Sequence, residues 1–123
     1  MSCLFDSLAR FIPDERVDGR VLRTTICDFL QTNPTLIDDM LADAIVREET
    51  GMGLDQYVTN MRNTFTYGGA IEIRCFTRIF KLNVLVESQP NGKTIEFIEN
   101  PEALWAVVNW NGGHYEPVEK KVI

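Results

Sequence analysis

Apolar residues recur at helical spacing through the first two thirds of the chain. The spacing predicts an amphipathic helix over residues 3–12, which Pro13 stops, and a second over about 19–33, which Asn33-Pro34 ends. It also predicts a third helix over residues 35 to about 49. The inward stripe of this third helix would consist of Leu36, Ile37, Met40, Leu41, Ala44 and Ile45.

Two more helices are predicted before the pattern changes. A short one spans about 54–61 and keeps Tyr57, Val58 and Met61 on one side. A loop over 64–69 then leads to another helix over 70–80. This last helix would bury Ile71, Cys75, Phe76, Ile79 and Phe80.

After about residue 82 the apolar period becomes that of strands. Short strands are predicted over 83–87, 94–99, 104–109 and 114–118, with turns at Pro90-Asn91-Gly92 and Asn111-Gly112-Gly113. Strands that cluster after helices indicate an α+β fold, with helices packed around a small, mostly antiparallel β-sheet. The 123 residues carry no repeat or linker, so we expect a single domain over 1–123.

The charge balance narrows the classes of partner. The chain has 12 basic and 18 acidic residues, a net charge of −6, which argues against binding nucleic acid or an anionic membrane surface and suits a basic protein partner. Asp6 and Arg10 interrupt the apolar N-terminal residues, so these form neither a signal peptide nor a membrane span. We therefore expect a monomer that is cytoplasmic or nuclear and not secreted.

Three cysteines and one histidine are the residues with distinctive chemistry. An odd, sparse set of cysteines is not typical of a disulfide framework, and no pair has metal-ligand spacing, so we expect neither a metal nor a cofactor. Cys27 and Cys75 fall within the buried stripes, where cysteine acts as a small apolar residue. Cys3 instead heads the first predicted helix, where free N–H groups and the helix dipole favour a thiolate.

His114 lies on the last predicted strand, far from Cys3 in sequence. An imidazole across a cleft from a helix-heading thiol is the layout of a thiol hydrolase. Because side chains alternate along a strand, Tyr115 would face the core and Glu116 would share the face of His114. A carboxylate there can orient the imidazole and stabilise its protonated form. Taken one at a time, the alternatives are a core cysteine, a surface histidine and a solvated strand-edge glutamate.

Several short motifs follow one another along the chain. They are Cys3-Leu4-Phe5, Leu22-Arg23, Tyr57 with Met61, Tyr67-Gly68-Gly69 with Glu72, Asn83-Val84-Leu85-Val86, and His114-Tyr115 with Glu116. Their order and spacing, from Cys3 to Val118, resemble those of the OTU (ovarian tumour) domain cysteine proteases, a family of deubiquitinases. The resemblance implies a papain-type fold and hydrolysis of isopeptide bonds to ubiquitin or a ubiquitin-like protein.

The resemblance also implies a role for each candidate residue. Cys3 would be the nucleophile, His114 the general acid and base, and Glu116 the residue that orients His114. The turn Gly112-Gly113, flanked by Trp110, would line a narrow channel for the glycines of the substrate. The alternative for this turn is an ordinary hairpin connection.

The chain departs from the family pattern in two places. The family usually has Asp-Gly-x-Cys, whereas only Met1 and Ser2 precede Cys3 here, and Glu116 is one methylene longer than the usual Asp or Asn. The α-amino group is a candidate cation beside Cys3 in place of the missing motif. Two other functions stay open: a non-catalytic ubiquitin-binding module, and a viral peptidase that cleaves a polyprotein.

The acidic residues of the third and fourth predicted helices are candidate contacts for a basic substrate tail. The resemblance implies an arginine-rich tail, and the alternative is a solvated acidic face. These residues are Asp38, Asp39, Asp43, Glu48, Glu49 and Asp55.

Overall fold

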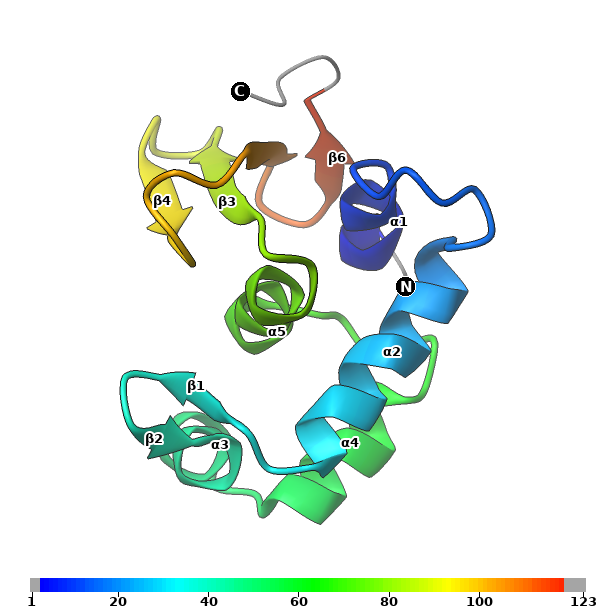
Figure 1. Cartoon of the computed structure of the whole chain (residues 1–123), viewed down its shortest axis with the longest axis vertical. Coiled ribbons are helices and arrows are strands. Elements are labelled where there is room, and N and C mark those ends of the chain that lie inside the picture. The colour runs from blue at the N-terminus through cyan, green and yellow to red at the C-terminus, as the bar shows by residue number, and fades with distance from the viewer. Residues whose placement is uncertain (1–2, 119–123) are drawn as a thin grey trace.

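A computed structural model describes residues 3–118, in which five helices and two sheets are found (Figure 1). The helices are α1 (Cys3–Ala9), α2 (Gly19–Gln31), α3 (Ala42–Thr50), α4 (Leu54–Met61) and α5 (Ala70–Phe80). The strands are β1 (Thr35–Ile37), β2 (Met40–Leu41), β3 (Asn83–Ser88), β4 (Thr94–Phe97), β5 (Trp105–Trp110) and β6 (Tyr115–Pro117).

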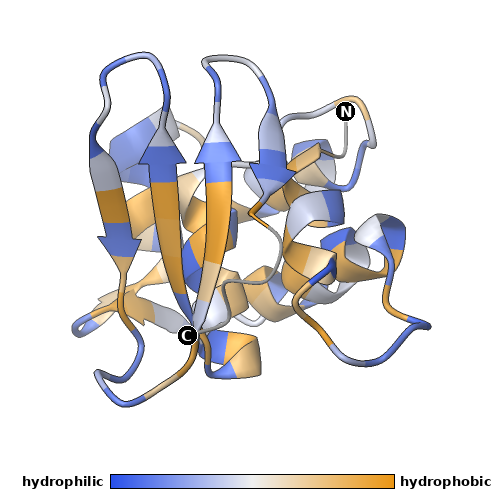
Figure 2. Cartoon of the chain, turned by 90° about the horizontal axis from the view of Figure 1, so that it is seen from above, coloured by the Kyte–Doolittle hydropathy of each residue, from blue (hydrophilic) through white to orange (hydrophobic). Residues whose placement is uncertain are grey.

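The larger sheet has the strand order β4-β3-β5-β6. β4 and β6 run antiparallel to their neighbours, while β3 and β5 run parallel to each other. Figure 2 shows the four strands side by side with the helices on one side of them. The predicted α+β fold with a mostly antiparallel sheet is therefore confirmed.

The core lies between this sheet and the helices. From β3 and β5, alternate residues such as Val84, Val86 and Val108 join Phe5 of α1 and Phe76 of α5 in one buried apolar cluster. α1 packs between α2 and the edge strand β6 (Figure 1). The helix that starts at Cys3 is thus held against the strand that follows His114.

The first helix is shorter than its apolar stripe predicts. The spacing predicts a helix to residue 12, but α1 ends at Ala9. Two tighter turns follow, in which Phe11 N donates to Leu8 O and Ile12 N donates to Ala9 O, both at 3.1 Å. The stripe therefore continues in tight turns up to Pro13.

No helix within residues 3–118 is long and apolar enough to cross a bilayer.

The prediction of a helix from residue 35 is wrong. Residues 35–41 form the β1–β2 hairpin, and α3 begins only at Ala42. Asp38 takes a left-handed conformation with φ 50°, which reverses the chain between the two strands. Of the predicted stripe, Leu36 and Ile45 are buried. The exposed members are Ile37, Met40, Leu41 and Ala44.

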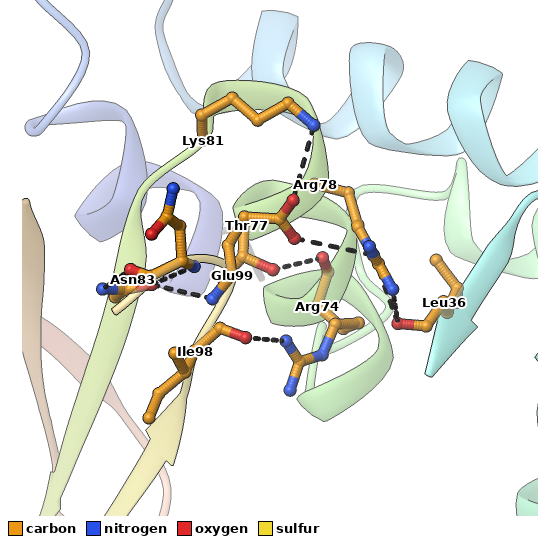
Figure 3. A network of polar contacts seen from close by, with 9 residues as sticks. Leu36, Arg74, Thr77, Arg78, Lys81, Asn83, Ile98 and Glu99 are labelled. Atoms are coloured by element: carbon orange, nitrogen blue, oxygen red, sulfur yellow. Dashed lines mark hydrogen bonds and ion pairs between the residues drawn. The ribbon is translucent and has the colours of Figure 1, made fainter. Parts of the chain in front are cut away.

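A polar network attaches this hairpin to α5 (Figure 3). Arg78 Nη2 donates to Leu36 O at 3.0 Å, and the Glu99 carboxylate lies 3.6 Å from Arg78 and 3.4 Å from Lys81. Arg74 Nη1 donates to Ile98 O at 3.1 Å. Arg78 of α5 therefore bridges β1 and the segment after β4, and Arg74 and Lys81 contact that segment as well.

Candidate active site

Cys3 is the most accessible of the three thiols. It is half-buried as the first residue of α1, and its carbonyl accepts a hydrogen bond from Ser7 Oγ at 2.7 Å. Cys27 and Cys75 are buried, and burial raises the pKa of Cys27 to about 11 and also raises the pKa of Cys75. Because thiols react as thiolates, chemistry at a cysteine is favoured at Cys3 over the other two.

The turn before β6 places His114. Asn111 Oδ1 accepts from His114 N at 2.9 Å and from Gly113 N at 3.2 Å, and Asn111 N donates to His114 O at 3.1 Å. Gly112 has φ +106°, a conformation that favours glycine. His114 itself lies just before β6, so the strand begins one residue later than predicted.

His114 and Glu116 lie close together and are both exposed. His114 Nε2 is 3.9 Å from Glu116 Oε1, and the two side chains are 53% and 67% exposed. Across the strand pair, Glu116 stands opposite Asn109, so these two side chains share a face of the sheet. The separation is longer than a hydrogen bond, and water reaches both groups.

Tyr115 connects this strand to Cys3. Its ring packs against the core and lies 6.5 Å, between centroids, from the ring of Trp110. Burial raises the pKa of Tyr115, and negative charge on Cys3 or Glu72 raises this pKa further. The packing of α1 on β6 thus brings Cys3 near the residue next to His114.

A hollow of about 450 Å³, here called the smaller hollow, lies between the β5–β6 hairpin and the loop before α5. It is lined by Tyr67, Gly68, Trp110, Gly112, Gly113 and Tyr115, which include the three predicted channel residues. Gly68 also packs on α1, since a Cβ there would lie 3.0 Å from both Leu4 Cδ2 and Phe5 Cε2. One wall is therefore the β5–β6 hairpin and the other is the loop before α5.

A larger hollow of about 460 Å³ shares Tyr67 and Gly68 with the smaller one. It runs between β1, α3, α5 and β4, and Glu49 and Arg74 are among its polar lining residues. The apolar lining includes Leu36, Ile37, Ile45, Met61, Ile71 and Phe97. The two hollows meet at the loop before α5.

Two buried charged residues beneath this loop were not predicted as site residues. Arg23 is 2% exposed and lies with its guanidinium 4.3 Å from the ring centroid of Phe5. Glu72 is equally buried, accepting from Tyr57 Oη at 2.6 Å and from Gly69 N at 2.7 Å. Burial raises the pKa of Glu72, and the two hydrogen bonds oppose that rise. The signals available in the sequence were the two motifs that contain these residues, Leu22-Arg23 and Tyr67-Gly68-Gly69 with Glu72, and the place of Arg23 on the buried face of a helix.

Two further predictions concern groups around the site. Met1 and Ser2, and with them the α-amino group, lie outside the described residues. Among residues 3–118, no group of three or more His, Cys, Asp or Glu side chains is placed to hold a metal ion.

Comparison with solved structures finds OTU domains. An ovarian tumor (OTU) domain in complex with ubiquitin aligns with a TM-score of 0.75 at 26% identity, over 94% of this chain and 62% of that one. An OTU deubiquitinase from Wolbachia pipientis wMel gives 0.69 at 20% identity, over 94% and 80%. The viral OTU domain protease from Dera Ghazi Khan virus gives 0.66 at 16% identity, over 94% and 72%.

Sequence comparisons identify the family. A search of curated proteins finds no match. The sequence model of the OTU-like cysteine proteases matches residues 2–112, which include Cys3 and stop two residues before His114. This match covers most of the chain and agrees with the architecture of α1, α5 and the sheet. The chain belongs to the family of OTU-like cysteine proteases.

Proposed function

We propose that this chain is a cysteine-dependent isopeptidase that removes ubiquitin or a ubiquitin-like modifier from lysine side chains. The observation that carries the proposal is an accessible thiol at the start of α1, together with a hollow that has glycines on both walls and whose Gly68 packs on the same helix. An extended glycine tail needs such a passage, because side chains on the walls would block it. The family and the ubiquitin-bound OTU domain support the choice of modifier.

The reaction would be acyl transfer in two steps. The Cys3 thiolate attacks the carbonyl carbon of the terminal glycine, and His114 protonates the lysine amine as the C–N bond breaks. His114 then takes a proton from water, whose oxygen attacks the thioester and releases the Cys3 thiolate. The N–H of Cys3 and a neighbouring N–H would hold the oxyanion, each contributing roughly 3–4 kcal/mol. Glu116 would orient His114.

The larger hollow would receive the part of the modifier that precedes its glycines. Glu49 lines this hollow and can attract a basic side chain of the tail. Two of the other candidate acids already have partners: Asp43 binds Arg47 at 2.9 Å, and Asp55 accepts from Gln31 at 2.8 Å. We therefore favour Glu49 among the acidic residues.

The test is a ubiquitin probe with a C-terminal electrophile. The expected result is one adduct, located at Cys3 and lost in Cys3→Ala, while thermal unfolding of that variant is unchanged. An adduct that persists in Cys3→Ala, or that maps to Cys27 or Cys75, would contradict the assignment of the nucleophile.

The second candidate function is a non-catalytic ubiquitin-binding module. The observation that favours it is the 3.9 Å separation between the exposed side chains of His114 and Glu116. Such a module would bind ubiquitin, as measured by calorimetry, and would form no adduct with the probe. The same two measurements therefore separate the two functions.

A further inference from the structure

Arg23 places a charge in the apolar core of the protein. It stands on the buried face of α2, among Leu22, Ile26 and Cys27. Burial lowers its pKa, but a guanidinium remains protonated inside proteins. A buried cation is costly unless it is hydrogen-bonded, so the partners of Arg23 indicate what it is for.

Arg23 donates to backbone carbonyls at the end of α4 and at the start of the loop that follows it. Nη1 donates to Met61 O at 2.8 Å and to Asn63 O at 3.0 Å, and Nη2 donates to Thr64 O at 3.4 Å. These carbonyls lie at residues 61–64, and we call residues 62–69 the anchored loop. Arg23 therefore fixes the first half of this loop through its main chain.

The far end of the anchored loop is fixed as well. Glu72 Oε1 accepts from Gly69 N, and its other oxygen accepts from the hydroxyl of Tyr57 on α4. Between the two anchors, Tyr67 and Gly68 form one wall of the smaller hollow. That wall is thus held from below at both ends by buried charged side chains.

Arg23 also contacts the helix that begins with Cys3. Its guanidinium stacks on the ring of Phe5, two residues after Cys3, and Gly68 of the anchored loop packs on the same ring. One side chain therefore touches both the nucleophile helix and the loop opposite the β5–β6 hairpin.

We propose that Arg23 is a positioning residue: it sets the anchored loop against α1 and so fixes the width of the smaller hollow beside Cys3. This inference rests on the proposed function, because the hollow matters only if a glycine tail passes through it. A lysine would keep the charge but would lose the planar fork that reaches several carbonyls and stacks on Phe5. An error of about 1 Å in such a position can slow a reaction by about 100-fold.

The experiment compares two reagents that react with the same sulfur. A ubiquitin probe must enter the hollow to reach Cys3, whereas iodoacetamide is small enough to reach it from solvent. Arg23→Lys should lower the probe rate by about 10- to 100-fold and leave the iodoacetamide rate within about twofold. Cys3→Ala corrects both rates for reaction at other cysteines.

A second variant moves the same wall without touching the arginine. Gly68→Ala would place a methyl group 3.0 Å from Leu4 and Phe5, so the anchored loop must shift away from α1. Gly68→Ala should therefore also lower the rate of reaction with the probe and leave the iodoacetamide rate nearly unchanged. The matched control is Gly53→Ala, since a Cβ at Gly53 meets only the guanidinium of Arg47 and Gly53 lines neither hollow.

Arg78→Lys controls for the general effect of losing an arginine bond to a backbone carbonyl. Arg78 binds Leu36 O, on the hairpin that lines the larger hollow (Figure 3). This variant should lower the unfolding temperature while keeping the ratio of probe rate to iodoacetamide rate much nearer the wild-type value than Arg23→Lys does. If the ratio of probe rate to iodoacetamide rate changes in Arg23→Lys and Gly68→Ala but stays near the wild-type value in Arg78→Lys, the effect is one of positioning and not of stability.

The outcomes distinguish this inference from the proposed function. If the unmodified chain forms no adduct with the probe, the proposed function is wrong and the inference fails with it. If the unmodified chain reacts, and Arg23→Lys and Gly68→Ala keep the wild-type ratio of the two rates, the inference alone is overturned. Gly68→Ala decides the matter should Arg23→Lys fail to fold.

Discussion

Polar side chains around the β5–β6 hairpin are exposed, whereas polar side chains beneath the anchored loop are buried. His114 and Glu116 are more than half exposed and 3.9 Å apart. Arg23 and Glu72 are at most 2% exposed, and each makes hydrogen bonds to the backbone of residues 61–69. Groups that must meet a substrate and exchange protons with water need access, whereas groups that hold a wall need fixed partners.

This contrast separates the effects of substitution. Exposed charge pairs contribute little to stability, so changes at the hairpin should alter rates and leave unfolding unaffected. Buried polar groups left without partners are costly, so changes under the loop should lower stability, and those that move the wall, such as Arg23→Lys, should lower the rate as well. Single substitutions in each region test whether effects on rate and effects on stability are separate, from the largest expected effect to the smallest.

His114→Ala should have the largest effect, on rate alone. Loss of a general acid and base lowers turnover by about 10²–10⁴-fold. Because the side chain is exposed and the turn is held by backbone bonds to Asn111, the unfolding temperature should stay at the wild-type value. Turnover of a fluorogenic ubiquitin substrate and a thermal melt are the two measurements. A fall in turnover of less than tenfold would remove His114 from the mechanism.

Tyr57→Phe should show the opposite behaviour. It removes the hydroxyl that donates to Glu72 at 2.6 Å and leaves a buried carboxyl oxygen without that partner. The free energy of unfolding in urea should fall by about 1–3 kcal/mol. Turnover well below the unfolding temperature should change by less than about threefold, because Glu72 still accepts from Gly69 N. A large loss of turnover without loss of stability would contradict the separation drawn here.

Glu72→Gln should change how stability depends on pH. Burial raises the native pKa of Glu72 above its ordinary value of 4.5, so the unfolded chain ionises first as pH rises. The contribution of Glu72 is therefore fully present below 4.5 and is lost as pH rises through the native pKa. A glutamine can accept from Gly69 N and donate to Tyr57 Oη without ionising.

The measurement is urea unfolding of both proteins at about pH 4 and about pH 7. The wild type should lose more stability than Glu72→Gln between these values. The difference between the proteins isolates Glu72, because every other titrating group is common to both. Parallel pH profiles would show that the burial of Glu72 does not affect stability in this range.

Local pattern was sufficient to predict most of the fold. α4 and α5 match the predicted ranges, and the strands of the larger sheet begin and end within two residues of them. Gly51 takes the left-handed conformation that ends α3. These elements have distinct periods and are separated by residues with strong turn preferences, so neighbours in sequence determine them.

The hairpin at residues 35–41 could not be predicted in this way. Arg78, from α5, binds Leu36 O of the hairpin, and the residues that flank the hairpin are joined, since Asn33 Oδ1 accepts from Asp43 N at the start of α3. Three of its four apolar side chains are exposed, so their spacing carries no information about burial. Tertiary contacts override a helical period here.

The same limit applies to the candidate site. Cys3 and the Gly112-Gly113 turn are recognisable from their position in the sequence, because a helix start and a tight turn are local features. The partners of Arg23 are carbonyl groups 38–41 residues away, and a carbonyl has no signature in the sequence. The signals in the sequence were its place on the buried stripe of α2, between Leu22 and Ile26, and the Leu22-Arg23 motif.

Glu116→Ala should have the smallest effect. Nε2 of His114 is 3.9 Å from Oε1 of Glu116, and exposed pairs of this kind are worth about 0–1 kcal/mol, so turnover should fall by less than about fivefold. Stability should be unchanged. Asn109, opposite Glu116 on β5, is the matched comparison, because its side chain lies on the same face of the sheet.

The two single variants and their combination decide which residue orients the ring. If Glu116 orients His114, Asn109→Ala should be nearly silent alone and should add nothing to Glu116→Ala. If the amide of Asn109 takes over when the carboxylate is removed, the double variant should lose more turnover than the two single losses combined predict. A fall beyond tenfold in Glu116→Ala alone would mean that the 3.9 Å pair closes to a hydrogen bond when substrate binds, and that the hairpin is less independent of burial than its exposure indicates.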